Sequence, residues 1–369
     1  MFNSKKAIMN LLKKADIRVN GNRPWDIQVY NRKFYARVFA GGSLALGESY
    51  MEKWWECERL DLFFEKLFRA KIRETKNLNL IILKLKSRLF NMQSLIRSKK
   101  VIDEHYDRDN EIYMAFLDVY NQYTCGYFEK TKDLNAAQEQ KLDLICKKLH
   151  LKASDTVLDI GCGWGGFAKY VSQKYGCHVT GITISDEQLK YARKYTDGLP
   201  VQIIKQDYRF LQGTFDKIVI VGMIEHVGYK NYRKIMKIVS RCLKDDGLFL
   251  LHTIGENETS VAGNPWTNKY IFPNGMLPSI QQIGKATENL LVMEDWHNFG
   301  PYYYDTLMAW DHNFRNNSPK LKGNYSESFF RMWRYYFLSY AGAFKARYLQ
   351  LWQIVFSKGE DDKVYQPIR

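Results

Sequence analysis

From about residue 155 onward, short β-rich runs alternate with helical segments, and this alternation constrains the fold of the 369-residue chain more than any other feature. Alternation of this kind predicts a parallel sheet that helices cover on both faces. We expect helices at segments such as 165–175 and 186–195, and added helices at about 301–345. The runs predicted as strands of a seven-stranded sheet are 156–160, 178–184, 201–205, 217–221, 248–254, 290–296 and 349–356.

The first 95 residues have a different pattern, helical and rich in large aromatic side chains. Between Tyr50 and Glu74 the apolar residues recur at the spacing of an amphipathic helix. This stripe is either core or a lipid-facing surface, since Trp and Phe beside Lys also suit a bilayer interface. Residues 81–100 predict a basic helix leading into the next domain. We therefore predict a helical N-terminal domain at 1–100, associated with lipid or membrane, and a second domain at 101–369.

The chain carries 55 basic and 40 acidic residues, a formal net charge of +15. Such an excess favours an anionic partner, either nucleic acid or an acidic membrane surface, although a merely soluble basic surface remains an alternative. Because no run of 18 apolar residues occurs, we expect no membrane-spanning helix. Lysines within residues 1–18 interrupt any signal-peptide core, which favours a cytoplasmic protein. The six scattered cysteines predict thiols in a reducing compartment, and we expect no metal site.

A glycine-rich turn follows the first strand of the predicted sheet, in the segment Val157–Gly166. Gly161 and Gly163 let backbone amides approach a ligand closely, as in dinucleotide sites. Asp159 distinguishes the two ligand classes, because a carboxylate here would repel a pyrophosphate but receive the ammonium of a methionine moiety. The turn therefore favours S-adenosylmethionine over a dinucleotide.

The segment after the second strand lacks the acidic residue that usually holds ribose hydroxyls about 20 residues beyond such a turn. It reads Gly181–Gln188, and Thr183 and Gln188 are the polar groups available there. After the third strand, Asp207 can accept from an adenine amino group while Tyr208 packs on the ring. These residues complete the predicted cofactor site.

The missing acid and a series of ordered motifs make the chain similar to the cyclopropane-fatty-acid synthases, which carry Gly-x-Thr-x-Ser-x-x-Gln at this place. The resemblance runs nearly end to end, and residues 1–95 resemble the bacterial synthase rather than its shorter mycobacterial relatives. It implies an α/β fold, a class I methyltransferase Rossmann-like seven-stranded sheet, with a helical N-terminal domain. The matching motifs are Pro24–Gln28, Gly47–Tyr50, His105–Asp107, Tyr123–Tyr127, Ile224–Gly228, His252–Gly255, Lys269–Gly275, Glu294–His297 and Leu351–Gln353.

The resemblance implies transfer of a methylene from S-adenosylmethionine to the cis double bond of unsaturated phospholipid acyl chains, at the inner face of the membrane. An isolated alkene is a poor nucleophile, so the sulfonium must be held close and aligned. Attack yields a cationic intermediate, which needs aromatic surroundings and a base shielded from water. The family implies that this base is bicarbonate and that Tyr123 and Thr124 lie over the cofactor. Carried over by motif, the bicarbonate cage is Cys125 and Ile254, through their backbone amides, with Glu225, His252 and Tyr303.

Several alternatives stay open at this point. Tyr303 lies in a run of three tyrosines, so a neighbour could take its place, and His252 could be an ordinary core histidine. A nucleic-acid methyltransferase would place an Asn- or Asp-Pro-Pro-aromatic segment after the fourth strand, where this chain has Gly222–His226. Lipid methylation without ring closure and a non-catalytic lipid-binding protein are the other rivals. A cysteine that some relatives carry late in the chain is Tyr340 here. A homodimer is plausible, because two membrane anchors gain avidity.

Overall fold

The computed structural model describes residues 4–72, 91, 93, 110–321, 323–360 and 364–369. The chain forms two compact units, and each is built from separate stretches of sequence. The first contains Met1–Met92, Val261–Gly275 and Tyr303–Leu349, and the second contains Gln93–Ser260, Met276–Tyr302 and Gln350–Arg369. The units are therefore interleaved along the chain rather than consecutive. The boundary near residue 100 lies outside the described residues and stays a prediction.

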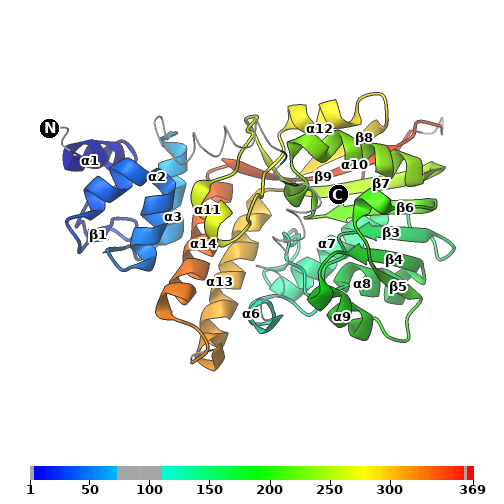
Figure 1. The fold of residues 1–369 in the computed structure, drawn as a ribbon, viewed down its shortest axis with the longest axis horizontal. Helices are drawn as coiled ribbons and strands as arrows, with labels where there is room; N and C mark the ends of the chain where they lie inside the picture. The colour runs from blue at the N-terminus through cyan, green and yellow to red at the C-terminus, as the bar shows by residue number, and fades with distance from the viewer. Residues whose placement is uncertain (1–3, 73–90, 92, 94–109, 322, 361–363) are drawn as a thin grey trace. The chain divides into compact units, whose positions relative to one another are not determined.

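The second unit is built on a seven-stranded sheet in the order β5-β4-β3-β6-β7-β9-β8 (Figure 1). Parallel pairing joins β3 to β4 and β6, β4 to β5, and β6 to β7, whereas β8 runs antiparallel to β9. All seven predicted strands are present, and the predicted α/β fold class is confirmed. The strands are β3 (Thr156–Ile160), β4 (His178–Thr183), β5 (Val201–Lys205), β6 (Phe215–Val221), β7 (Leu243–Glu256), β8 (Val292–Asn298) and β9 (Leu349–Ser357).

Helices pack on both faces of this sheet because successive strand residues point to opposite sides. On one face Val157, Val219 and Leu250 pack with residues of α7 (Leu134–Lys148) and α8 (Gly166–Tyr175). On the other, Leu158 and Phe249 pack with residues of α10 (Tyr229–Cys242) and α12 (Ile280–Thr287). In the described part of this unit, the remaining helical elements are α6 (Asn110–Met114), α9 (Asp186–Tyr195) and the short 3-10 helices η1 (Tyr208–Phe210) and η2 (Ile224–His226).

The first unit is mainly helical, as predicted for the N-terminal region, and α13 and α14 confirm the added helices expected at about 301–345. Among the residues that the structure describes, its elements are α1 (Ser4–Lys14), β1 (Gln28–Val29), α2 (Phe34–Met51), β2 (Trp55–Glu56), α3 (Leu60–Arg69), α11 (Pro265–Tyr270), α13 (Pro301–Leu321) and α14 (Glu327–Lys345). Within the described part of the chain, no helix is both long enough and apolar enough to cross a membrane.

The prediction of one amphipathic helix from Tyr50 to Glu74 is wrong. Helix α2 ends at Met51, and Lys53 takes a left-handed conformation with φ 61° before α3 begins at Leu60. The aromatic side chains Trp55 and Phe63 are fully buried, with ring centroids 5.2 Å apart. The centre of the stripe is therefore core rather than a lipid-facing surface. The basic helix predicted at 81–100 and the motif at 105–107 lie outside the described residues.

Candidate active site

The glycine-rich turn joins β3 to α8, and its backbone takes conformations that favour glycine. Gly161 and Gly163 have φ of 84° and 54°, in the left-handed region. A Cβ built on Gly163 would meet no atom within 4 Å, whereas one on Gly161 would lie 2.6 Å from the Met223 side chain. The backbone at Gly163 therefore borders open space, as a site that receives a ligand against its main chain requires.

Asp159 lies one residue before the end of β3 and is only 2% exposed. Its Oδ2 atom has no hydrogen-bond partner among the described residues. Burial raises the pKa of this carboxyl to about 7, while the Lys141 ammonium acts in the opposite direction. A buried carboxylate without a partner is costly, and a ligand ammonium would supply the missing charge. The site thus fits the methionine end of S-adenosylmethionine.

Thr183 and Gln188, predicted to replace the missing acid, are brought together at the end of β4 and the start of α9. The Thr183 hydroxyl donates to Gln188 Oε1 at 2.8 Å. The side chain of Ser185 caps α9 by accepting from the Gln188 backbone N–H. Because the Gln188 carbonyl oxygen accepts from Thr183, its amide nitrogen is the group that can donate to a ligand.

Asp207 and Tyr208 adjoin each other at the start of η1, after β5. Asp207 Oδ1 caps η1 by accepting from the Arg209 backbone N–H at 2.9 Å, and its Oδ2 pairs with the Arg209 guanidinium at 2.8 Å. An adenine amino group would have to share these oxygens. The Tyr208 ring packs into the core on the α10 face of the sheet. Their contacts with adenine stay predictions.

The segment 122–125 carries Tyr123, Thr124 and Cys125, and side chains of helix α7 hold it by hydrogen bonds. Gln138 Nε2 donates to the Thr124 carbonyl oxygen at 2.7 Å. Lys141 Nζ donates to Thr124 Oγ1 at 3.0 Å and to Gln122 Oε1 at 2.5 Å. The Tyr123 ring packs edge-on against Tyr113 and Phe116 of the neighbouring α6 region. The segment expected to contact both cofactor and bicarbonate is thus held in place by hydrogen bonds from one helix.

Sequence reasoning missed Lys141, although its side chain is completely buried. Burial lowers the pKa of its ammonium to about 8, and the nearby carboxyls of Asp118 and Asp159 oppose that shift. No sequence signal marked it, because its spacing on α7, three residues after Gln138 and seven before the completely buried Lys148, identifies a buried face only once the packing is known. A helix face that buries two lysines points to a negative charge close by.

Glu225, in η2 after β6, is 8% exposed and lies against the end of β7. The Ile254 backbone N–H donates to its Oε1 at 2.8 Å, whereas Oε2 has no partner among the described residues. Burial raises the pKa of this carboxyl to about 6. The Ile254 amide that was expected to hold bicarbonate is therefore already used by Glu225, and the two would have to share it.

His252 lies on β7, two residues before Ile254, and is 1% exposed. Its Nε2 atom has no hydrogen-bond partner among the described residues. Burial and the positive charges of Lys141 and Lys148 hold the pKa of the imidazole well below its usual value, so the ring is neutral. Cys125, fully buried, turns its thiol toward the Gly126 carbonyl oxygen at 3.2 Å.

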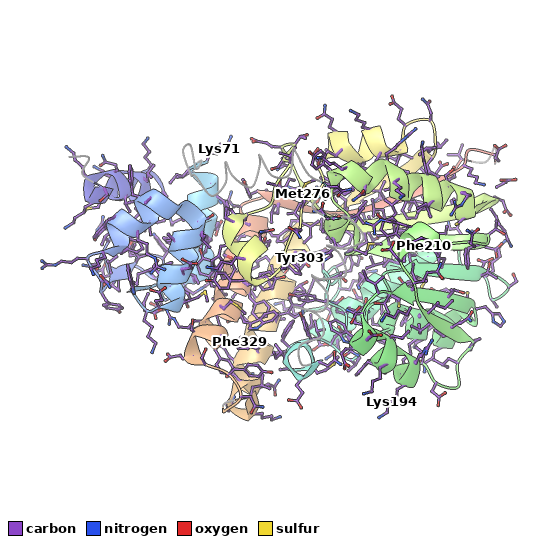
Figure 2. The ribbon with its side chains drawn as sticks, in the orientation of Figure 1. Lys71, Lys194, Phe210, Met276, Tyr303 and Phe329 are labelled. Carbon is purple, nitrogen blue, oxygen red and sulfur yellow. The ribbon has the colours of Figure 1, made fainter. Side chains whose placement is uncertain are left out.

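Tyr303, the last predicted cage residue, lies near the start of α13 (Figure 2) and belongs to the first unit. Its ring lies against Phe344, with centroids 4.5 Å apart. The alternative Tyr304 donates its hydroxyl to Asp61 at 3.1 Å, which gives that tyrosine a structural role in the same unit. The other neighbour, Tyr302, packs on Tyr127 in the second unit. The role of Tyr303 in the cage stays a prediction.

Residues 93–354 match the model of the family described as mycolic acid cyclopropane synthetase. Over 354 residues the chain is 51% identical to a protein named cyclopropane-fatty-acyl-phospholipid synthase from Escherichia coli strain K12, a match that covers 95% of this chain and 93% of that protein. It is also 37% identical over 276 residues to a probable fatty acid methyltransferase from Pseudomonas putida, which covers 70% of this chain and 69% of the relative.

Solved structures with the same fold include the cyclopropane synthase MmaA2 from Mycobacterium tuberculosis, with a TM-score of 0.66 and 25% identity, covering 70% of this chain and 98% of that one. The mycolic acid cyclopropane synthase CmaA1, in complex with SAH and CTAB, gives the same TM-score and coverage at 28% identity. The family model, the relatives and the fold agree with the glycine-rich turn and the buried polar groups at the strand ends. The chain therefore belongs to the mycolic acid cyclopropane synthetase family of S-adenosylmethionine-dependent enzymes.

Proposed function

We propose that this enzyme adds a methylene from S-adenosylmethionine across the cis double bond of unsaturated phospholipid acyl chains and closes a cyclopropane ring. The observation that carries the proposal is the 51% identity to the Escherichia coli synthase along 95% of the chain. That similarity includes most of residues 1–92, which the family model, matching residues 93–354, does not reach.

The cofactor would supply an electrophilic methyl on its sulfonium, and the residues around the β3 turn would hold it. Asp159 Oδ2, buried and without a partner among the described residues, suits its ammonium, and the open backbone at Gly163 leaves room for its chain. The Gln188 amide nitrogen can donate to a ribose hydroxyl. Lys141 holds Thr124 in place, so the Tyr123–Cys125 segment needs little rearrangement when the ligand binds.

Ring closure requires removal of a proton from the transferred methyl after the alkene carbon has bonded to it. We propose bicarbonate as the base that accepts this proton, held by the cage of Cys125, Glu225, His252, Ile254 and Tyr303. Glu225 Oε2 and His252 Nε2 are both buried without a partner among the described residues, and a small oxyanion that can donate and accept would satisfy both. Because Glu225 has a raised pKa, a carboxyl proton can be shared with the anion near neutral pH.

We further propose that the enzyme is cytoplasmic and binds the inner face of the membrane through its basic surface. Helix α1 exposes Lys5, Lys6, Lys13 and Lys14, and the apolar side chains of Met9 and Leu11 are 43% and 38% exposed. Exposed lysines beside apolar residues suit an anionic lipid surface.

A vesicle assay tests the membrane proposal. Replacing Lys13 and Lys14 with Glu should weaken binding to anionic vesicles, and added salt should weaken the binding of the wild type. The matched control replaces Lys190 and Lys194, exposed on α9, in the same way. Equal loss in both variants, or equal wild-type binding to neutral and anionic vesicles, would contradict a role for α1.

Lipid analysis of cells that express the protein tests the reaction itself. The proposal predicts unsaturated phospholipids that gain one CH2, resist ozonolysis at the former double bond and show the upfield proton signal of a cyclopropane in NMR spectra.

The same mass gain with a surviving double bond would identify methylation without ring closure, the second candidate. That candidate is favoured by relatives named as a fatty acid methyltransferase and as sphingolipid C9-methyltransferases. An unchanged lipid profile, with protein present and folded, would reject both.

A further inference from the structure

Gln353, a residue with no role in the proposed site so far, contacts the ring of His252 inside the second unit. It lies on β9, the neighbour of β7 in the sheet, and is completely buried. Its amide nitrogen lies 3.3 Å from His252 Nδ1. Both side chains extend toward the α7 face of the sheet. Leu250 lies two residues before His252 on β7 and Val355 lies two residues after Gln353 on β9, and both pack on that face.

The contact determines which ring nitrogen of His252 carries the proton. The ring is neutral, since burial and the ammonium groups of Lys141 and Lys148 all disfavour the charged form. A neutral imidazole has one N–H, and the other nitrogen accepts. The Gln353 amide nitrogen donates to Nδ1, so the proton is on Nε2, the atom that has no partner among the described residues.

We propose that Gln353 is a positioning residue that fixes His252 in the Nε2–H form, so that His252 donates a hydrogen bond to the bound oxyanion rather than taking the substrate proton itself. The inference rests on the proposed function for the identity of the anion. A histidine that donates from Nε2–H holds the oxyanion in place and leaves the other oxygens of the anion free to accept the substrate proton. An Nε2 without a proton would instead compete with the anion for that substrate proton.

Two substitutions alter the contact in different ways. At a pH above the raised pKa that burial gives a carboxyl, Gln353→Glu offers only carboxylate acceptors, so the ring should place its proton on Nδ1 and leave Nε2 without one. Gln353→Met keeps most of the volume and removes the hydrogen bond, so both tautomers should be populated. The matched control is Gln350→Glu, a buried residue on the same strand whose side-chain oxygen accepts from Asn298 at 3.1 Å and still could as a carboxylate.

The direct readout is the pair of 15N chemical shifts of His252 in ligand-free, 15N-histidine-labelled protein, assigned by the signal that His252→Gln removes. We expect a protonated Nε2 in the wild type and in Gln350→Glu, exchange toward Nδ1–H in Gln353→Met, and the Nδ1–H form in Gln353→Glu. A wild-type ring protonated on Nδ1, or a tautomer that Gln353→Met leaves unchanged, would overturn the inference. If Gln353→Glu does not fold, Gln353→Met alone decides the matter.

Turnover supplies the second readout. In Gln353→Glu the bicarbonate concentration for half-maximal activation should rise about tenfold or more, because one hydrogen bond to an anion is lost, while the KM for S-adenosylmethionine stays within about twofold. A loss of folding stability would not raise one constant and spare the other. Failure of the proposed function and failure of this inference can be told apart. If wild-type activity does not respond to bicarbonate, bicarbonate is not the base, but the tautomer measurement still tests the role of Gln353. Unchanged half-activation in Gln353→Glu would overturn the inference even if ring formation is demonstrated.

Discussion

The two ends of the proposed site differ in how far the protein satisfies its own polar groups. Around the cofactor turn, Thr183 bonds Gln188 and Asp207 bonds Arg209, while Asp159 Oδ2 and the Tyr208 hydroxyl are buried without a partner among the described residues. Beside β7, each of the side chains Glu225, His252 and Gln353 keeps one buried atom, respectively Oε2, Nε2 and Oε1, without a partner among the described residues. Buried polar atoms without partners are rare in folded proteins. Both ends therefore need a ligand to be complete, but hydrogen bonds within the protein already position Thr183, Gln188 and Asp207 at the cofactor end, whereas Glu225, His252 and Gln353 each keep an unsatisfied atom.

The largest effect should come from closing the open backbone at the cofactor end. Gly163→Val places a branched side chain in the ligand's space at a left-handed φ, and S-adenosylmethionine binding should become undetectable by calorimetry. Gly198→Val is the matched control, since Gly198 has φ 75° and equally open surroundings but lies outside the site. A well-folded Gly163→Val that binds S-adenosylmethionine with wild-type affinity would show that the cofactor does not bind at this turn.

A smaller effect, confined to the cage end, is expected from Glu225→Gln. Loss of one charge-assisted hydrogen bond costs about 1.5–3 kcal/mol, so turnover should fall roughly ten- to a hundredfold. Affinity for S-adenosylmethionine should not change, because Glu225 bonds the Ile254 amide on β7 rather than the turn at Asp159–Gly166. Added bicarbonate should partly rescue the variant. Equal losses of turnover and cofactor affinity would contradict the separation into two ends.

The smallest effect is on stability, and its sign follows from the raised pKa of Glu225. The folded-state pKa is about 6 against an ordinary value of 4.5, so the folded protein binds this proton more tightly than the unfolded chain does. The stability that protonation provides is therefore complete below pH 4.5 and is lost as the pH rises through about 6. Above that window the buried charge costs about 2 kcal/mol.

Glu225→Gln cannot ionise, so the folded variant does not carry the free-energy cost of a buried charge. In bicarbonate-free buffer at pH 8, its free energy of unfolding measured by urea titration should exceed that of the wild type by about 2 kcal/mol. The difference should vanish near pH 4.5. Glu288→Gln, at an exposed position, serves as the control. A variant less stable than the wild type at pH 8 would show that Glu225 is already satisfied without a ligand.

The sequence predicted the features that depend on local pattern. The seven strands follow from runs of β-rich residues between helical segments, and the turn at Asp159–Gly166 follows from its glycines. The break at Lys53 was not predictable, because the amphipathic spacing continues across a left-handed residue. Nor was Lys141, since only the packing of α7 against the sheet shows that this lysine is buried. The cage residues came from family resemblance, and nothing in the sequence indicated that the Ile254 amide bonds Glu225.

The unsatisfied groups beside β7 are proposed to hold bicarbonate as the base for ring closure. The most direct measurement is cyclopropane formation by purified enzyme on unsaturated phospholipid vesicles in rigorously degassed, bicarbonate-free buffer, followed by titration with bicarbonate. We expect strongly reduced turnover that bicarbonate restores in a saturable manner, with the response weakened in Glu225→Gln. Full activity without bicarbonate, unchanged on its addition, would contradict the claim and move the base to a protein side chain, with Glu225 the first candidate.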